Sequence, residues 1–142
     1  VNWLFGKPGS VSCLARNVVP GSGYDVVSTN YLYEDGKVIN AQADWTLEGD
    51  YGFEMLYRVN FEKANLIFNA SGLKVNPNDA PGFNPEISPE MGYYLEQKYF
   101  IETLLAGQEV ATATPESTKG TIEIAVAEIE SADKQGAWVQ VK

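Results

Sequence analysis

The chain has 142 residues, of which 44% are hydrophobic and 20% are charged. This composition is typical of a globular domain of ordinary size and argues against intrinsic disorder. The formal net charge of −9 argues against nucleic acid and anionic membranes as partners, because both attract basic surfaces.

The single cysteine, Cys13, cannot form an intrachain disulfide, which favours a reducing compartment, so we expect a cytoplasmic protein. The chain has no histidine to act as a base, and we therefore expect Cys13 to be a small buried residue and not a nucleophile. We expect neither a signal peptide nor a membrane span, because no apolar run approaches ~20 residues.

The first six residues, Val1 to Gly6, have the pattern of the last turn of an amphipathic helix closed by a glycine. Neither a helix start nor an initiator methionine precedes this turn, so we expect a fragment of a longer protein. Strand patterns follow at 10–19 and 25–33, and Asp35-Gly36 predicts a hairpin to a return strand over 38–47.

The return strand alternates, with Ile39, Ala41, Ala43 and Trp45 on one face. A further strand over 53–61 repeats this pattern, and two short strands surround a turn at Ser71-Gly72. The pattern predicts an antiparallel meander with one apolar face. We expect the other face to be open and to form a homo-oligomer contact through Asn40, Gln42, Asp44, Glu54, Leu56 and Arg58.

Residues 76–89 contain four prolines and are predicted to form a loop, either functional or simply connecting. Two helices follow, and Ser88-Pro89-Glu90 and Thr114-Pro115-Glu116 resemble helix starts. We expect one apolar stripe in each helix to face the core: Tyr93, Tyr94, Phe100, Ile101, Leu104 and Leu105 in the first, and Thr118, Thr121, Ile122, Ala125, Val126, Ile129 and Ala132 in the second.

A last strand over 138–141 completes the predicted fold. We predict one α+β domain of two layers, in which two helices cover one face of a largely antiparallel mixed sheet of about six strands.

Chemical motifs are scarce. A nucleophilic triad would need a base, and the chain has no histidine to supply one. No calcium-binding pattern occurs, and we expect the scattered acidic side chains to be solvated. Gly21-Ser22-Gly23 is predicted to be a turn between strands, which is a poor nucleotide site because no helix N-terminus follows it. We therefore predict no catalytic residue, no metal and no cofactor site in this chain.

Ligand contact has better support. Tyr93 and Tyr94 lie at a helix start directly after the proline-rich loop, where free N–H groups favour oxygen-rich ligands. Both tyrosines also fit the apolar stripe, so a role as core anchors is the alternative. Arg16, Asn17 and Trp45 are further candidates for contact with a substrate. The alternative for Arg16 and Asn17 is an ordinary pair of surface residues, and the alternative for Trp45 is an aromatic residue of the sheet.

The order of these motifs resembles the C-terminal end of the Gfo/Idh/MocA oxidoreductases. The most specific match is Gly92-Tyr93-Tyr94-x-Glu96-x-x-Tyr99-Phe100. Trp3-Leu4-Phe5-Gly6 resembles the helix end that follows the segment with the catalytic histidine in that family.

This resemblance implies a GAPDH-like C-terminal domain from a two-domain NAD(P)-dependent enzyme. A Rossmann domain outside this chain would hold NAD or NADP and a catalytic lysine. The chain would then supply one wall of a cleft for a small sugar or cyclitol and an oligomer contact, without activity of its own. The resemblance does not choose among inositol and sugar dehydrogenases, biliverdin reductase and NAD-dependent glycosidases.

A stand-alone, non-catalytic α+β module that binds a small ligand and dimerises is the competing hypothesis. The coding sequence upstream of Val1 separates the two hypotheses. A glycine-rich βαβ segment in frame favours the enzyme, and a start codon near Val1 favours the module.

Overall fold

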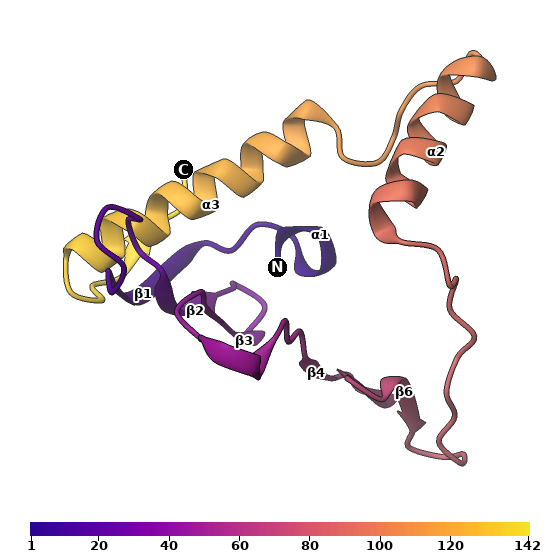
Figure 1. Ribbon diagram of the computed structural model, residues 1–142, viewed down its shortest axis with the longest axis horizontal. Coiled ribbons are helices and arrows are strands. Elements are labelled where there is room, and N and C mark those ends of the chain that lie inside the picture. Colours follow the sequence, from indigo (N-terminus) through magenta and orange to yellow (C-terminus); the bar gives the residue numbers. More distant parts are fainter. The chain divides into compact units, whose positions relative to one another are not determined.

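A computed structural model describes residues 1–142, which form an α+β fold with seven strands in two antiparallel sheets (Figure 1). The chain divides into two compact units, one made of Val1–Leu47 with Gln108–Lys142 and the other of Glu48–Gly107. The predicted α+β class is confirmed. The strands do not form the expected single sheet, because those of each unit pair only among themselves.

The first unit contains a four-stranded antiparallel sheet in the order β3-β2-β1-β7. Its elements are α1 (Asn2–Phe5), β1 (Ser10–Arg16), β2 (Val26–Leu32), β3 (Val38–Asp44), α3 (Pro115–Asp133) and β7 (Val139–Gln140). The predicted hairpin joins β2 to β3, and Gly36 adopts a φ of +80° in its turn. The N–H of Gly36 donates to the carbonyl of Tyr33 at 3.2 Å.

One face of this sheet and α3 enclose the core of the unit. The buried hydrophobic cluster consists of Val11, Tyr31, Tyr33, Ile124, Ala127 and Val139. The alternation predicted for β3 is confirmed at Ile39 and Ala41, which pack against this cluster. Trp45 lies beyond the end of β3 and its side chain is 80% exposed, so the predicted face does not extend to it.

The face that α3 turns inward differs from the predicted one. Ile124, Ala127 and Ser131 are buried, whereas Ile122, Val126 and Ile129 are 53–59% exposed. The sheet already contributes the large rings of Tyr31 and Tyr33, and a close-packed layer opposite them needs mostly small side chains. The prediction that Ile122, Val126 and Ile129 face the core is therefore wrong.

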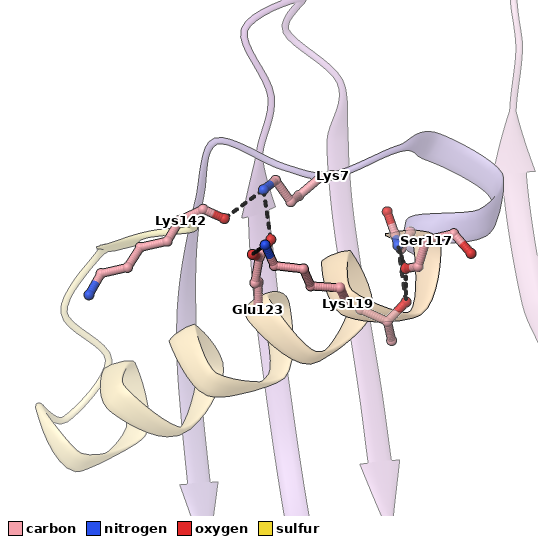
Figure 2. A network of polar contacts seen from close by, with 7 residues as sticks. Lys7, Ser117, Lys119, Glu123 and Lys142 are labelled. Atoms are coloured by element: carbon pink, nitrogen blue, oxygen red, sulfur yellow. Dashed lines mark hydrogen bonds and ion pairs between the residues drawn. The ribbon is translucent and has the colours of Figure 1, made fainter. Parts of the chain in front are cut away.

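Local signals place the ends of α1 and α3. The Thr114 hydroxyl accepts from the N–H of Ser117 at 3.3 Å, and Pro115 occupies the first helical position, as predicted. Gly6 closes α1 with a φ of +77°, and its N–H donates to the carbonyl of Asn2 at 2.9 Å. Figure 2 shows Ser117 at this end of α3 and also shows Lys7, whose ammonium group contacts Glu123 at 2.9 Å.

The second unit contains a three-stranded antiparallel sheet in the order β4-β5-β6. Its elements are the 3₁₀-helix η1 (Gly49–Tyr51), β4 (Tyr57–Asn60), β5 (Ala64–Asn69), β6 (Gly72–Pro77) and α2 (Gly92–Leu105). The strand expected from residue 53 begins only at Tyr57, whose ring stacks on that of Phe68. The proline-rich segment is irregular, apart from a β-bridge between Val75 and Phe83.

The helix α2 also differs from its prediction. It begins at Gly92, and Ser88 does not cap it, because the Ser88 hydroxyl accepts from the N–H of Glu90 instead. Thr103 is its only buried residue, and the stripe expected to face the core is exposed. No hydrophobic side chain of the second unit is buried, so no other element of that unit covers this stripe. None of the helices is both long and apolar enough to cross a membrane.

Candidate ligand pocket

A cavity of about 590 Å³ opens in the first unit between β1, β2, α3 and the turn that joins the two strands. Its volume is within the range of small-molecule sites, about 300–1,000 Å³. The residues that line it are Cys13, Ala15, Asn17, Ser22, Gly23, Tyr24, Val27, Thr29, Ala125, Glu128 and Ile129.

The strands supply a mostly apolar floor. Ala15 and Val27 lie beside Cys13 and Thr29, which are both almost fully buried. Burial raises the pKa of the Cys13 thiol, the contact with Thr29 lowers it, and the nearby Glu128 carboxylate raises it again. The net shift is upward, which keeps the thiol protonated and is consistent with the predicted unreactive cysteine.

The helix α3 contributes the one carboxylate of the pocket, that of Glu128. The Tyr31 hydroxyl donates to Glu128 Oε1 at 2.5 Å and holds this side chain against the sheet. Burial raises the pKa of Tyr31, and the hydrogen bond to Glu128 raises it further, so the phenol remains a donor throughout the physiological range. A half-buried carboxylate over an apolar floor can accept hydrogen bonds from ligand hydroxyls.

Asp25 organises the turn that forms the rim. Its carboxylate accepts from the N–H of Val18 at 2.8 Å, from the N–H of Val19 at 2.7 Å and from the Ser22 hydroxyl at 2.8 Å. Burial raises the pKa of Asp25, but these hydrogen bonds to Val19, Ser22 and Val18 outweigh it and bring the pKa below its usual range. Asn17 Nδ2 also donates to the carbonyl of Val19 at 2.9 Å.

Tyr24 connects this rim to the end of α3. Its hydroxyl donates to Asp133 Oδ1 at 2.7 Å, and this bond raises the pKa of Tyr24. The rim is therefore attached to both elements that enclose the pocket. We infer a pre-formed site for a small neutral ligand with hydroxyl groups, because apolar surface and a few placed acceptors suit such a molecule.

The same turn does not fit a dinucleotide. Gly21 and Gly23 have positive φ angles of 84° and 87°, but their turn leads from β1 into the antiparallel strand β2 and not into a helix. A phosphate cradle needs the free N–H groups of a helix N-terminus behind the glycines. No group of three or more acidic or cysteine side chains comes together as a candidate metal site.

A second cavity, of about 480 Å³, lies near the start of β1 and includes Lys7, Tyr33 and Lys37. Lys7 pairs with Glu123, a contact that lowers the pKa of Glu123, and Lys37 pairs with Asp35. Figure 2 shows Lys7 between Glu123 and the carbonyl of Lys142, so its charge is already engaged. This second cavity is the weaker candidate.

Of the predicted substrate residues, only Asn17 lines the larger pocket. Arg16 ends β1 and Trp45 follows β3, and neither lines it. Tyr93 and Tyr94 belong to the second unit and are 76% and 51% exposed, so their alternative role as core anchors is wrong. A substrate role for these tyrosines stays a prediction.

The predicted interface residues are divided between the two sheets. Asn40, Gln42 and Asp44 lie on β3, where Asn40 Nδ2 donates to Asn30 Oδ1 and Gln42 Nε2 to Asn40 Oδ1. Arg58 lies on β4, and Glu54 and Leu56 precede it. The six residues therefore do not share one sheet face, and their interface role stays a prediction.

Glu128, Thr29 and Tyr24 also line this pocket and are not among the site residues predicted from the sequence. Glu128 is four residues after Ile124 and three before Ser131, so it lies on the buried face of α3. Small residues at Ala127 and Ser131 are the signal that could have identified this face, because they permit close approach to a sheet. An acid on such a face is a stronger site candidate than a solvated one.

No family model matches this sequence, and no curated protein sequence matches it. Solved structures do match. An oxidoreductase from Agrobacterium radiobacter, in complex with NAD+, L-tartaric acid and magnesium, superposes with a TM-score of 0.80 at 16% identity, over 99% of this chain and 45% of its own. A levoglucosan dehydrogenase in complex with NADH and levoglucosan superposes with a TM-score of 0.77 at 18% identity, over 99% of this chain and 46% of its own.

An oxidoreductase from Thermotoga maritima gives a TM-score of 0.73 at 20% identity, over 99% of this chain and 40% of its own. The chain therefore has the fold of one part of these oxidoreductases. It spans less than half the length of each of the three.

Proposed function

We propose that this chain is the substrate-binding and oligomerisation part of an NAD(P)-dependent oxidoreductase of the Gfo/Idh/MocA type, which acts on a hydroxyl or carbonyl group of a sugar or cyclitol. The observation that carries the proposal is that nearly the whole chain superposes on less than half the length of each of two oxidoreductases, with TM-scores of 0.80 and 0.77. One of these proteins, a levoglucosan dehydrogenase, was solved in complex with NADH and levoglucosan.

In this proposal the pocket between β1, β2 and α3 is one wall of the substrate site. Glu128 accepts hydrogen bonds from substrate hydroxyls, and Tyr31 holds the carboxylate in place. The turn carrying Asn17 and Tyr24 borders the bound sugar. The proposal assigns the dinucleotide to another part of the protein, which agrees with the Gly21-Gly23 turn leading into the strand β2 and not into a helix.

The first experiment titrates the isotope-labelled chain with levoglucosan and with myo-inositol, and follows amide shifts by NMR. We expect saturable shifts at Cys13, Thr29 and Glu128 in the millimolar range. Glu128→Gln should weaken binding several-fold, because a hydrogen bond to a charged acceptor contributes about 1.5–3 kcal/mol and the amide keeps only part of it. Glu130→Gln is the matched control, an exposed acid on the same helix.

Two results would contradict the proposal. One is a lack of any pocket shift with polyols at saturating concentration. The other is saturable binding of NAD or NADP to this chain, which would place the cofactor site in the wrong part of the protein.

A further inference from the structure

The polar hydrogens on the rim of the pocket are already bound to acceptors of the protein itself. Asn17 Nδ2 donates to the carbonyl of Val19 at 2.9 Å and to the Ser22 hydroxyl oxygen at 3.0 Å. It also donates to the carbonyl of Gly23. The Ser22 hydroxyl has a single hydrogen, and its oxygen lies 2.8 Å from Asp25 Oδ2 and 2.9 Å from the Val19 carbonyl. Neither rim side chain therefore has a donor left for a ligand.

The hydroxyl groups of the floor and of the far rim are used in the same way. Tyr24 donates to Asp133 Oδ1 at 2.7 Å, and Tyr31 donates to Glu128 Oε1 at 2.5 Å. The hydroxyl of Thr29, which is buried, hydrogen-bonds to the side chain of Tyr31. What these side chains leave to a ligand is acceptor oxygen and not donor hydrogen.

Glu128 is the strongest of these acceptors because its side chain carries a full charge. Tyr31 occupies Oε1, and no group of the first unit donates to Oε2. None of the ion pairs of that unit includes Glu128, and no lysine or arginine lines the pocket. A carboxylate that is partly removed from water is stabilised by an opposite charge nearby. Within the first unit, Glu128 has no such partner.

The surroundings of Glu128 are acidic as well. Asp25 and Asp133 bind the hydroxyl groups of the rim. Burial raises the pKa of Cys13 and of Tyr31, and the Glu128 carboxylate raises both further, while no lysine or arginine lowers either. The first unit therefore gives its pocket a negative potential, which attracts a cation and repels an anion.

We propose that the pocket prefers a polyol that carries an ammonium group, such as an amino sugar, whose ammonium donates to Glu128. The preference rests on the proposed function, since it concerns the substrate class of the same pocket. An ammonium group has three donors and no acceptor, whereas each ligand hydroxyl also has lone pairs that need donors. The aromatic ring of Tyr24, which lines the pocket, adds attraction for a cation. A carboxylate or phosphate ligand would meet neither a cation nor a free side-chain donor.

Three sugars that differ in charge test this preference. Glucosamine and glucuronate each replace one group of glucose, by an ammonium and by a carboxylate. The isotope-labelled chain is titrated with each sugar at a pH at which the amine is protonated, and amide shifts are followed at Thr29 and Glu128. We expect glucosamine to bind about fivefold more tightly than glucose or better, because a charge-assisted hydrogen bond is about twice as strong as a neutral one. Glucuronate should cause no saturable shift in the pocket.

Glu128→Gln assigns the preference to one side chain. Glutamine keeps an acceptor for Tyr31 but has no charge, so glucose and glucosamine should then bind within about twofold of each other. Glu130→Gln is the matched control, because it removes an equal charge from an exposed position of the same helix and should keep the preference. Circular dichroism verifies that both variants fold. Sodium chloride gives a second test on the wild type, since it should weaken glucosamine binding and leave glucose binding unchanged.

The outcomes separate this preference from the proposed function. Equal affinity of glucose and glucosamine at the pocket would overturn the preference and leave the proposed function standing. So would a preference that survives Glu128→Gln, or saturable binding of glucuronate in the pocket. If none of the three sugars binds there, the proposed function is contradicted and the preference with it.

Discussion

Ser131 offers a test of how α3 is held to the sheet. Its side chain is fully buried, and its hydroxyl accepts from the N–H of Cys13 at 2.8 Å and donates to the carbonyl of Ala137 at 2.6 Å. The pairing of Val11 with Val139 would continue to Cys13 and Ala137, but β7 includes only Val139–Gln140. The hydroxyl thus replaces a ladder bond between the two strands.

Ser131→Ala removes this bridge. The N–H of Cys13 is buried and would lose its acceptor, which costs about 1–3 kcal/mol, whereas the carbonyl of the exposed Ala137 can bond to water. At roughly 4 °C per kcal/mol, we expect the melting temperature to fall by about 4–12 °C. Differential scanning calorimetry measures this shift, and amide exchange should show lost protection at Cys13.

Ser117→Ala is the matched control, because it removes an exposed hydroxyl from the same helix. Alanine gains up to ~0.5 kcal/mol of helix propensity over serine at both sites, so the difference between the variants isolates the bridge. Equal melting temperatures for the two variants would refute the reasoning that the Ser131 hydroxyl ties α3 to β1.

Three further predictions follow from the same structure. Asp25 has a lowered pKa in the folded state, so its stabilising effect is complete above its unfolded pKa of about 3.9 and is lost as the pH falls through its folded value. In urea unfolding, Asp25→Asn should therefore lose less stability in acid than the wild type does. Equal dependence of the unfolding free energy on pH in the two proteins would contradict this. Cys13 is buried with a raised pKa, so a thiol reagent should modify it far more slowly in native buffer than in denaturant, and equal rates would show an accessible thiol. Leu56 is one of the predicted interface residues, so we expect Leu56→Glu to weaken self-association in sedimentation; association unchanged by Leu56→Glu would remove Leu56 from that interface.

Features that depend on a few neighbouring residues could be predicted from the sequence. The Asp35-Gly36 hairpin, the Thr114 cap and the Gly6 helix end all rest on backbone angles and hydrogen bonds within a few positions. The alternation at Ile39 and Ala41 is similarly local, because successive side chains of any strand point to opposite faces. These signals together were enough for the α+β class.

The candidate site was predicted only at Asn17. Glu128 and Thr29 come together because α3 packs against β1, which pairs with β2, and these contacts join residues about a hundred positions apart. Helical periodicity identifies an apolar stripe, but it does not tell whether the stripe or the smaller face beside it meets the sheet. The space left by Tyr31 and Tyr33 decided that question for α3.

The division of the strands into two sheets was likewise decided by tertiary structure. The alternating pattern over 53–61 is the same whether a strand extends one sheet or begins another, since alternation reports a face and not a neighbour. Composition and local pattern therefore determined the kinds of elements and their ends, whereas only long-range packing determined which surfaces meet.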